Sequence, residues 1–303
     1  MCSTSTYCGS SSRERVTALA LGLVLFSAFV HASWNFLLKK SGGGAGLITA
    51  ASAFSLVVYA PVVAFVAWRW GYAFRPAHLG MMLGSGIIHT AYFLLLDRAY
   101  RSGGDLSIVY PLARATGPLL SILVAVAVLG ERPGPTAIGG AVLIVASALV
   151  LTGNPFAWRR SGALQAGAFA LLTGCTIAGY TIWDKAAVAT WLIPPLLYDW
   201  GCNAFRVCVL LPWTRAHAPG SIAKAWQERR KTVVAIAVLS PLAYILVLTA
   251  MVFTPVSLVA PAREVSILFA ALMGAHLLRE GDVTRRAVAA IGMVLGVSGL
   301  ALG

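Results

Sequence analysis

Long apolar blocks separated by short polar segments dominate the sequence. Ten such blocks, each 16 to 24 residues long, can be distinguished. They lack the alternation of apolar and polar faces that marks a helix on the surface of a soluble domain. At a rise of about 1.5 Å per residue, most are long enough to cross a hydrocarbon core of roughly 30 Å. The expected spans lie near residues 16–38, 47–67, 79–96, 106–129, 136–151, 163–183, 192–212, 232–253, 256–278 and 287–302.

The composition agrees with a membrane protein. Charged residues make up 11% of the chain and hydrophobic residues 59%, whereas an ordinary soluble domain carries about 25% charge. The formal charge of +13 comes from clusters such as Arg159-Arg160 between apolar blocks. Positive loops beside lipid headgroups explain these clusters better than a nucleic-acid partner does. Five cysteines without paired spacing predict neither a metal site nor a cofactor.

Three groups of residues recur in the same order in both halves of the chain. Arg114 and Arg263 each precede a glutamate by 17 residues, which places the two copies 149 residues apart. The other two groups recur at offsets of 146 and 152 residues. They pair Trp34 and Lys39 with Tyr180 and Lys185, and Ala91-Tyr92 with Ala243-Tyr244. This agreement in order and offset indicates an internal duplication.

The duplicated unit contains five expected helices, and an odd number makes the second copy enter the membrane from the opposite side. We therefore expect an all-α integral membrane fold of ten transmembrane helices, arranged as two inverted five-helix repeats. Residues 1–15 are expected to form a flexible N-terminal tail, 16–152 the first repeat and 163–303 the second. Transporters with inverted repeats usually bind their substrate at the interface between the repeats.

These features resemble the EamA family of the drug/metabolite transporter superfamily over about 16–303. The matching residues are His31-Ala32-Ser33-Trp34-Asn35 running into Lys39, Gly130-Glu131-Arg132 after the fourth span, and Arg279-Glu280-Gly281 after the ninth. The resemblance implies a bacterial ten-helix carrier, multi-pass in the inner (plasma) membrane. It also implies a central cavity walled by helices 1, 3, 4, 6, 8 and 9, through which small metabolites such as amino acids move.

Polar residues within apolar spans are the candidates for a binding site, because a charge at the centre of a membrane helix costs about 2.5–3.5 kcal/mol on insertion scales. His31, Asn35 and Lys39 are spaced four residues apart and share one face of the first span. We expect this face to line a cavity. The alternative is a structural hydrogen-bond ladder, with Lys39 extending to the membrane interface.

Two arginines occupy matching positions in the fourth and ninth spans. Arg114 is bracketed by Pro111 and Pro118, where a broken helix is expected, and Arg263 follows Pro261. Two guanidinium groups placed symmetrically would hold a carboxylate or phosphonate by paired hydrogen bonds. The alternative is that each arginine is neutralised by an acid, and Glu264 makes this a serious alternative for Arg263.

Aromatic residues and a second histidine complete the predicted site, since aromatic rings offer large area and a polar edge to an amphipathic solute. The full set of candidate substrate-binding residues is His31, Trp34, Asn35, Lys39, His89, Tyr92, Tyr110, Arg114, Tyr180, Tyr244, Arg263 and Glu264. Most of the aromatics are equally compatible with packing. His31, His89 and Glu264 are also the candidates for proton exchange during transport.

Other polar residues are assigned structural roles. Asp199 and Arg206 are seven residues apart on one face of the seventh span, where an intrahelical or neighbour-bridged pair is expected. Glu131 and Glu280 are expected at turns that water reaches, and Lys185 is expected to mirror Lys39.

The sequence therefore predicts a secondary transporter that moves a small polar or anionic metabolite by alternating access, without enzymatic activity. Its partners would be a small-molecule substrate and membrane lipids, and coupling to a proton or another ion is left open. The protein would be a monomer or a homodimer. The alternative is a membrane-embedded enzyme acting on a lipid-linked substrate with His31 or His89 as base. A clustered acid-base or metal motif, which such an enzyme needs, is not apparent in the sequence. A third class is a membrane scaffold that does not transport.

Overall fold

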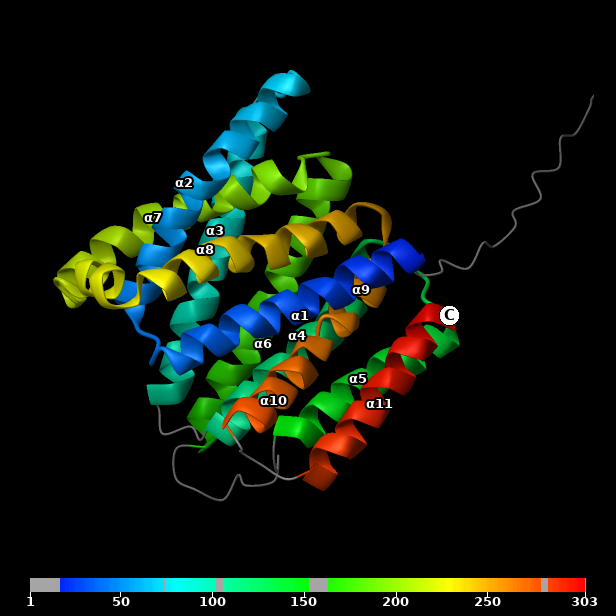
Figure 1. Cartoon of the computed structure of the whole chain (residues 1–303). Helices are drawn as coiled ribbons and strands as arrows, with labels where there is room; N and C mark the ends of the chain where they lie inside the picture. The colour runs from blue at the N-terminus through cyan, green and yellow to red at the C-terminus, as the bar shows by residue number, and fades with distance from the viewer. Residues whose placement is uncertain (1–16, 74, 102–105, 153–162, 279–282, 303) are drawn as a thin grey trace, which may run out of the picture.

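The structure is a computed structural model that describes residues 17–73, 75–101, 106–152, 163–278 and 283–302 (Figure 1). Across these ranges the chain forms helices and connecting turns, and none of them contains a β-strand. The prediction of an all-helical fold is confirmed. The predicted N-terminal tail, residues 1–15, lies outside the described residues, as does Glu280.

The helices follow the predicted apolar blocks closely. In the first half they are α1 (Ala18–Lys40), α2 (Ala45–Arg69), α3 (Pro76–Arg101), α4 (Leu106–Val128) and α5 (Pro135–Thr152). In the second half they are α6 (Ala163–Lys185), the π-helical segment η1 (Ala186–Thr190), α7 (Pro195–His217), α8 (Ser221–Phe253), α9 (Val256–Ala262), α10 (Val265–Leu278) and α11 (Val283–Leu302).

The connection between α7 and α8 is shorter than the sequence suggests. Residues 213–231 lie between the expected seventh and eighth spans, but α7 continues to His217 and α8 already begins at Ser221. The backbone of Arg229 is non-helical, with φ −135° and ψ 28°, and marks a kink inside α8. The basic segment before the eighth apolar block is therefore a helical extension of α8 and not a loop.

The predicted ninth span is broken, whereas the fourth is continuous. Between α9 and α10 the backbone N–H groups of Glu264 and Ser266 donate to the carbonyl oxygens three residues earlier, at 3.0 and 3.1 Å. Such bonds tighten the chain into a turn where an α-helix would use residues four apart. The expected break in the fourth span is wrong. Packing of α4 along α6 sustains that helix across its prolines, because tertiary contacts supply most of a helix's stability.

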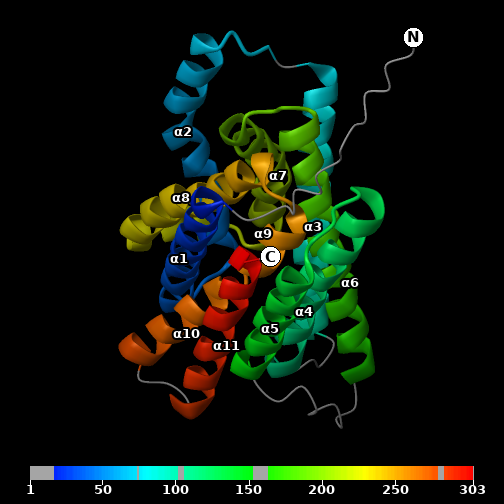
Figure 2. The same cartoon turned by 90° about the vertical axis from the view of Figure 1, so that its right-hand side faces the viewer.

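Small residues set the closest helix contacts. α5 packs along α11, and Figures 1 and 2 show the two helices side by side. A Cβ atom on Gly140 would lie 2.4 Å from the carbonyl oxygen of Gly296, so only glycine permits this approach. Similarly, Gly174 of α6 lies against Thr116 of α4. Small residues at helix contacts are typical of membrane proteins, in which backbone proximity replaces the hydrophobic driving force.

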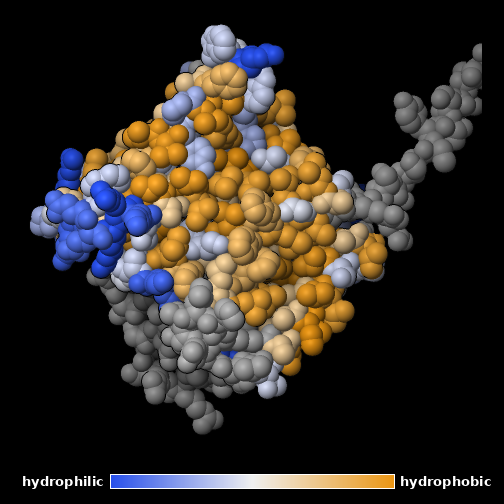
Figure 3. Space-filling model, viewed as in Figure 1, coloured by the Kyte–Doolittle hydropathy of each residue, from blue (hydrophilic) through white to orange (hydrophobic). Residues whose placement is uncertain are grey.

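The outer surface is strongly apolar. Of the helices in the described ranges, α1, α2 and α8 are long and apolar enough to cross a membrane by length and composition. Large side chains such as Phe26, Val57 and Phe65 are exposed on α1 and α2. Figure 3 shows hydrophobic surface over most of one face and hydrophilic residues at the α7–α8 connection. These features are those of a protein whose surroundings include lipid.

Candidate functional site

A buried ion pair joins the two halves of the chain where the broken helix meets α4. The Nε atom of Arg114 lies 3.1 Å from Oε2 of Glu264, the second residue of the turn between α9 and α10. Arg114 Nη2 also donates to the hydroxyl of Ser266, at 3.3 Å. Glu264 is 4% exposed. The turn thus presents an acid and a hydroxyl to an arginine 150 residues earlier in the chain.

Arg263, the other residue of this turn, has a different environment. Its guanidinium carbon lies 5.6 Å from the centre of the Tyr244 ring, within the range of a cation–π contact. In the described part of the chain, no carboxylate forms an ion pair with it and no group accepts a hydrogen bond from its side chain. Arg263 is half-buried. It therefore provides a positive charge with free donors inside the helix bundle.

Tyr244 belongs to a group of aromatic rings that comes from three helices. His89 of α3 stacks on Tyr180 of α6, with ring centres 4.1 Å apart, and meets the ring of Tyr244 on α8 edge to face at 5.8 Å. Tyr92 contacts Tyr180 edge to face at 6.2 Å. Nδ1 of His89 lies 3.0 Å from the carbonyl oxygen of Ser85, which fixes the ring. The structure thus brings together four of the predicted aromatic and histidine residues.

A buried acid lies behind this aromatic group. Asp184, at the end of α6, is 0% exposed and accepts hydrogen bonds from the hydroxyls of Tyr198, at 2.6 Å, and Tyr244. Tyr244 therefore binds Asp184 through its hydroxyl and supports Arg263 through its ring. Sequence analysis did not select Asp184 as a site residue, although an acid directly after an apolar span was a signal for it.

The three residues of the predicted polar face of α1 have different surroundings in the structure. His31 is half-buried and interacts electrostatically with Arg114 and Arg263. Its ring meets that of Trp34 edge to face, with the ring centres 5.1 Å apart. Asn35 donates to the carbonyl oxygen of His31 at 2.8 Å, a bond within its own helix. Lys39 is exposed at the C-terminal end of α1. The face therefore brings His31 to the arginines, whereas Lys39 lies about 12 Å further along the axis.

Trp34 and Tyr110 are the remaining candidates. Trp34 packs against an apolar cluster between α2 and α8, and its buried Nε1 has no hydrogen-bond partner among the described residues. Tyr110 lies on α4, but its side chain is outside the described part of the structure. In the described residues, groups of three or more His, Cys, Asp or Glu that would suit a metal ion are not present.

Glu131 lies in the turn after α4, as predicted, but its side chain is buried. It is 7% exposed, so the expected access of water to this turn is wrong. Its two carboxylate oxygens accept the backbone N–H groups of Val256, at 2.7 Å, and Ser257, at 2.8 Å. A carboxylate is stabilising here because the first N–H groups of a helix lack partners within it and carry partial positive charge. Glu131, from the first half, thus holds the start of the broken helix in the second.

Lys185 is likewise a structural contact between helices. Its Nζ donates to the carbonyl oxygens of Met251, at 2.6 Å, and Thr254, at 3.0 Å. These are among the last carbonyl groups at the end of α8, where a cation is favourable. Lys185 therefore does not repeat the exposed position of Lys39.

Comparison with known proteins identifies the fold but no activity. Neither a comparison with protein-family models nor one with curated proteins gives a match. A solved structure described only as "Crystal structure of protein" is similar with a TM-score of 0.73 and 15% sequence identity. The match covers 93% of this chain and 97% of that one. The described helices therefore follow an arrangement already observed in another protein.

Proposed function

We propose that the protein is a multi-pass membrane carrier that moves a small polar or anionic metabolite by alternating access. The observation that supports this most directly is Arg263, a half-buried arginine without an acid partner among the described residues. An arginine kept inside an apolar bundle is a candidate for a functional group. A carboxylate or phosphonate on the solute would accept its free donors.

The pattern of helix contacts supports two equivalent halves. The five helices of the first half, α1 to α5, correspond in order to α6, α7, α8, the α9–α10 pair and α11. α1 packs on α8 and α3 packs on α6, and exchanging corresponding helices converts one contact into the other. The same exchange converts α2 on α8 into α7 on α3, and α4 on α6 into α10 on α1. The contact of α5 with α11 maps onto itself. Such a pattern is expected of two units related by a pseudo-two-fold axis. If each unit crosses the membrane five times, the units have opposite orientations, and the axis lies in the membrane plane.

The broken helix supports a binding role for the turn at Arg263 and Glu264. In transporters with inverted repeats, discontinuous helices commonly provide the groups that bind substrate. We propose that ten membrane spans, with α9 and α10 together forming the ninth, place this turn inside the bundle in a bacterial inner membrane. The carrier would be of the type represented by the EamA family of the drug/metabolite transporter superfamily.

A mechanism follows from the contacts between the halves. Arg114 belongs to the first half, whereas Glu264 and Arg263 belong to the second. An anionic group bound by Arg263 would also compete with Glu264 for Arg114, which would weaken the ion pair that joins the halves. The rings of Tyr180, Tyr244 and His89 would cover the apolar part of the solute. Binding energy would thus be used to change the relative position of the halves.

Flux measurements with the full chain in lipid vesicles test this function. Vesicles loaded with a mixture of amino acids, organic acids and phosphonates should lose or exchange at least one of them only when the protein is present. Arg263→Ala should abolish this flux, whereas Arg215→Ala, which changes an exposed arginine on α7, should retain it. Chemical conversion of a solute without net movement would indicate the enzyme alternative, and equal flux in Arg263→Ala and wild type would refute the role of Arg263.

A further inference from the structure

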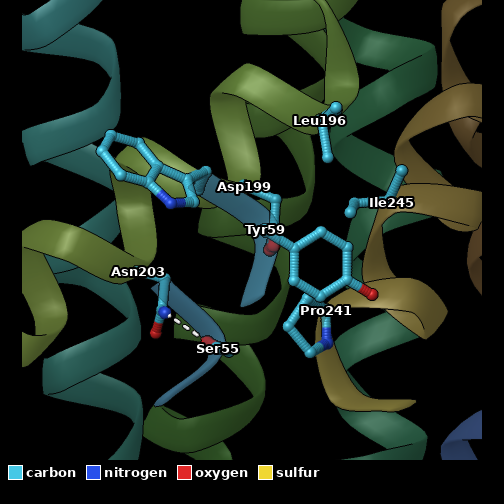
Figure 4. A pocket seen from close by; sticks show the side chains of 8 residues that line it. Ser55, Tyr59, Leu196, Asp199, Asn203, Pro241 and Ile245 are labelled. Atoms are coloured by element: carbon cyan, nitrogen blue, oxygen red, sulfur yellow. Dashed lines mark hydrogen bonds between the residues drawn. The ribbon is translucent and has the colours of Figure 1, made fainter. Parts of the chain in front are cut away.

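A second polar cluster lies between α2, α7 and α8. It surrounds a narrow pocket that has no room for a water molecule (Figure 4). The lining residues are Ser55, Tyr59, Leu196, Asp199, Trp200, Asn203, Pro241 and Ile245. Arg114, Arg263 and Glu264 are not among them, so the pocket is distinct from the proposed substrate site.

Asp199 is the unusual member of this cluster. It is 7% exposed, and its side chain lines the pocket. Within the described ranges its carboxylate forms no hydrogen bond and no ion pair with a basic side chain, so the predicted pair with Arg206 is not formed. By contrast, Asp184, which is also buried, accepts two tyrosine hydroxyls. An ionised carboxylate buried without partners is unfavourable, because it loses hydration without compensation.

The polar neighbours of Asp199 are engaged elsewhere. The hydroxyl of Tyr59 donates to the carbonyl oxygen of Val238 at 2.8 Å. The amide nitrogen of Asn203 donates to Ser55 Oγ, at 2.8 Å, and to the Ser52 carbonyl oxygen, at 3.0 Å. The hydroxyl of Ser55 in turn donates to the same Ser52 carbonyl, at 2.9 Å. The surrounding network is thus complete without Asp199.

Of the charges near Asp199, Arg206 compensates its negative charge in part, without forming an ion pair in the described ranges. Arg206, two turns further along α7, directs its guanidinium to the side-chain oxygen of Asn203, at 2.7 Å from Nη2. Asp184 on α6 adds a second negative charge that interacts with Asp199. The other titratable groups that interact with Asp199 are Tyr59 of α2 and Cys202 of α7. From α8, Pro241 and Ile245 face the pocket and are apolar.

We infer that Asp199 is a proton-binding site that gains and loses a proton as the packing of α2 and α7 changes. A bound proton removes the negative charge, which has no hydrogen-bonded partner among the described residues. A metal ion fits less well, because it needs several oxygen ligands. The side-chain oxygen of Asn203 is already bound by Arg206, whose positive charge would repel a cation.

The position of Asp199 gives this proton a possible use in transport. α2 belongs to the first half and α7 to the second, and the two helices pack together at this cluster. Protonation of Asp199 would alter the stability of that contact, and so would couple the relative position of the halves to pH. The coupling rests on the proposed function, whereas binding of the proton at Asp199 does not.

Infrared difference spectroscopy of the full chain in lipid, comparing alkaline and acidic pH, tests the proton site. Wild type should show a band from a protonated carboxyl group that disappears in Asp199→Asn. The band should persist in Glu228→Gln, which removes an exposed acid on α8, and in Arg263→Ala, which the proposed function makes inactive in transport. A band that is unchanged in Asp199→Asn overturns the proposal. Loss of the band on addition of sodium at constant pH assigns the site to a metal ion and also overturns it.

A measurement on unmodified protein covers the case in which Asp199→Asn does not fold. Hydrophobic carbodiimides react with protonated carboxyl groups, and mass spectrometry of peptides locates the label. Labelling of Asp199 should be present at acidic pH and decrease as the pH rises. Absence of label on Asp199 at every pH overturns the site. For the coupling, an imposed proton gradient should accelerate flux in wild type and not in Asp199→Asn, and gradient-independent flux in wild type overturns the coupling alone.

Discussion

Glu264 pairs with Arg114 and not with its sequence neighbour Arg263. The carboxylate lies 3.1 Å from Nε of Arg114, in the other half of the chain. Adjacent residues in the turn between α9 and α10 thus point to different surroundings, one to the ion pair and one to the ring of Tyr244. This arrangement neutralises one arginine and leaves the other available for a ligand.

The first prediction concerns the stability of the ion pair. Replacing Glu264 with Gln leaves the buried guanidinium of Arg114 without its carboxylate, so the variant should lose about 3 kcal/mol of stability. Replacing both residues with apolar ones, Arg114→Met with Glu264→Leu, should recover most of that loss, since well-packed apolar groups substitute for buried pairs. Unfolding midpoints in detergent measure both effects. Equal losses in the single and double variants would show that the pair is not the cause.

A second prediction concerns the contact of α5 with α11. Gly140→Ala places a methyl group against the backbone of Gly296 and should destabilise the protein by about 1–3 kcal/mol, as overpacking does. The adjacent Gly139 provides a matched control, because a Cβ there meets no atom within 4 Å. Gly139→Ala should be neutral or slightly stabilising. Thermal unfolding of the two variants in parallel separates packing from helix propensity, and similar melting temperatures would argue against the close contact.

The third prediction concerns Glu131 as the cap of α9. Glu131→Ala removes the acceptor of two buried backbone N–H groups and should destabilise by about 1–3 kcal/mol. Glu131→Gln keeps one side-chain oxygen and should lose less. Glu228→Ala, at an exposed position of α8, is the control for loss of a negative charge. If hydrogen exchange at Val256 and Ser257 is unchanged in Glu131→Ala, the capping interaction is not formed.

The two functions of Tyr244 can be separated by a fourth experiment. Tyr244→Phe removes the hydroxyl that donates to Asp184 but retains the ring beside Arg263. We expect it to lose about 1–3 kcal/mol of stability while retaining solute binding. Tyr244→Leu should lose both stability and affinity, because the cation–π contact contributes about 0.5–2 kcal/mol. Equal affinities in Tyr244→Leu and Tyr244→Phe would remove the ring from the site.

The helices themselves were predictable, because each one corresponds to a continuous apolar block in the sequence. Long apolar blocks leave few alternatives, since a chain in lipid must pair its backbone groups internally. The start of α8 was not predictable, because Lys224 and Arg229 belong to a polar segment that forms one helix with the apolar block after it. The break near Arg263 was assigned to the wrong span, because Pro111 and Pro118 resemble Pro261 in sequence and only packing distinguishes them.

Candidate site residues were recognised by type, but their partners were not. An arginine or histidine is conspicuous in an apolar sequence, and Arg263 and His89 do lie near the shared ring of Tyr244, while Arg114 pairs with the residue next to Arg263. Pairing depends on contacts between residues far apart in the chain. The partner of Arg114 is 150 residues away, and the cap formed by Glu131 spans 125 residues. Neither relationship has a signature at short spacing.

Binding by Arg263 is tested most directly by a thermal-shift screen of the purified protein against amino acids, organic acids, phosphonates and amines. A true ligand raises the melting temperature with concentration, because it binds the folded state. At least one anionic solute should stabilise wild type and Arg215→Ala alike. In Arg263→Ala its affinity should fall about tenfold or more, since a charge-assisted hydrogen bond contributes about 1.5–3 kcal/mol, and Arg263→Lys should be intermediate. Stabilisation by amines alone, or equal affinity for the anionic solute in Arg263→Ala, would contradict the account.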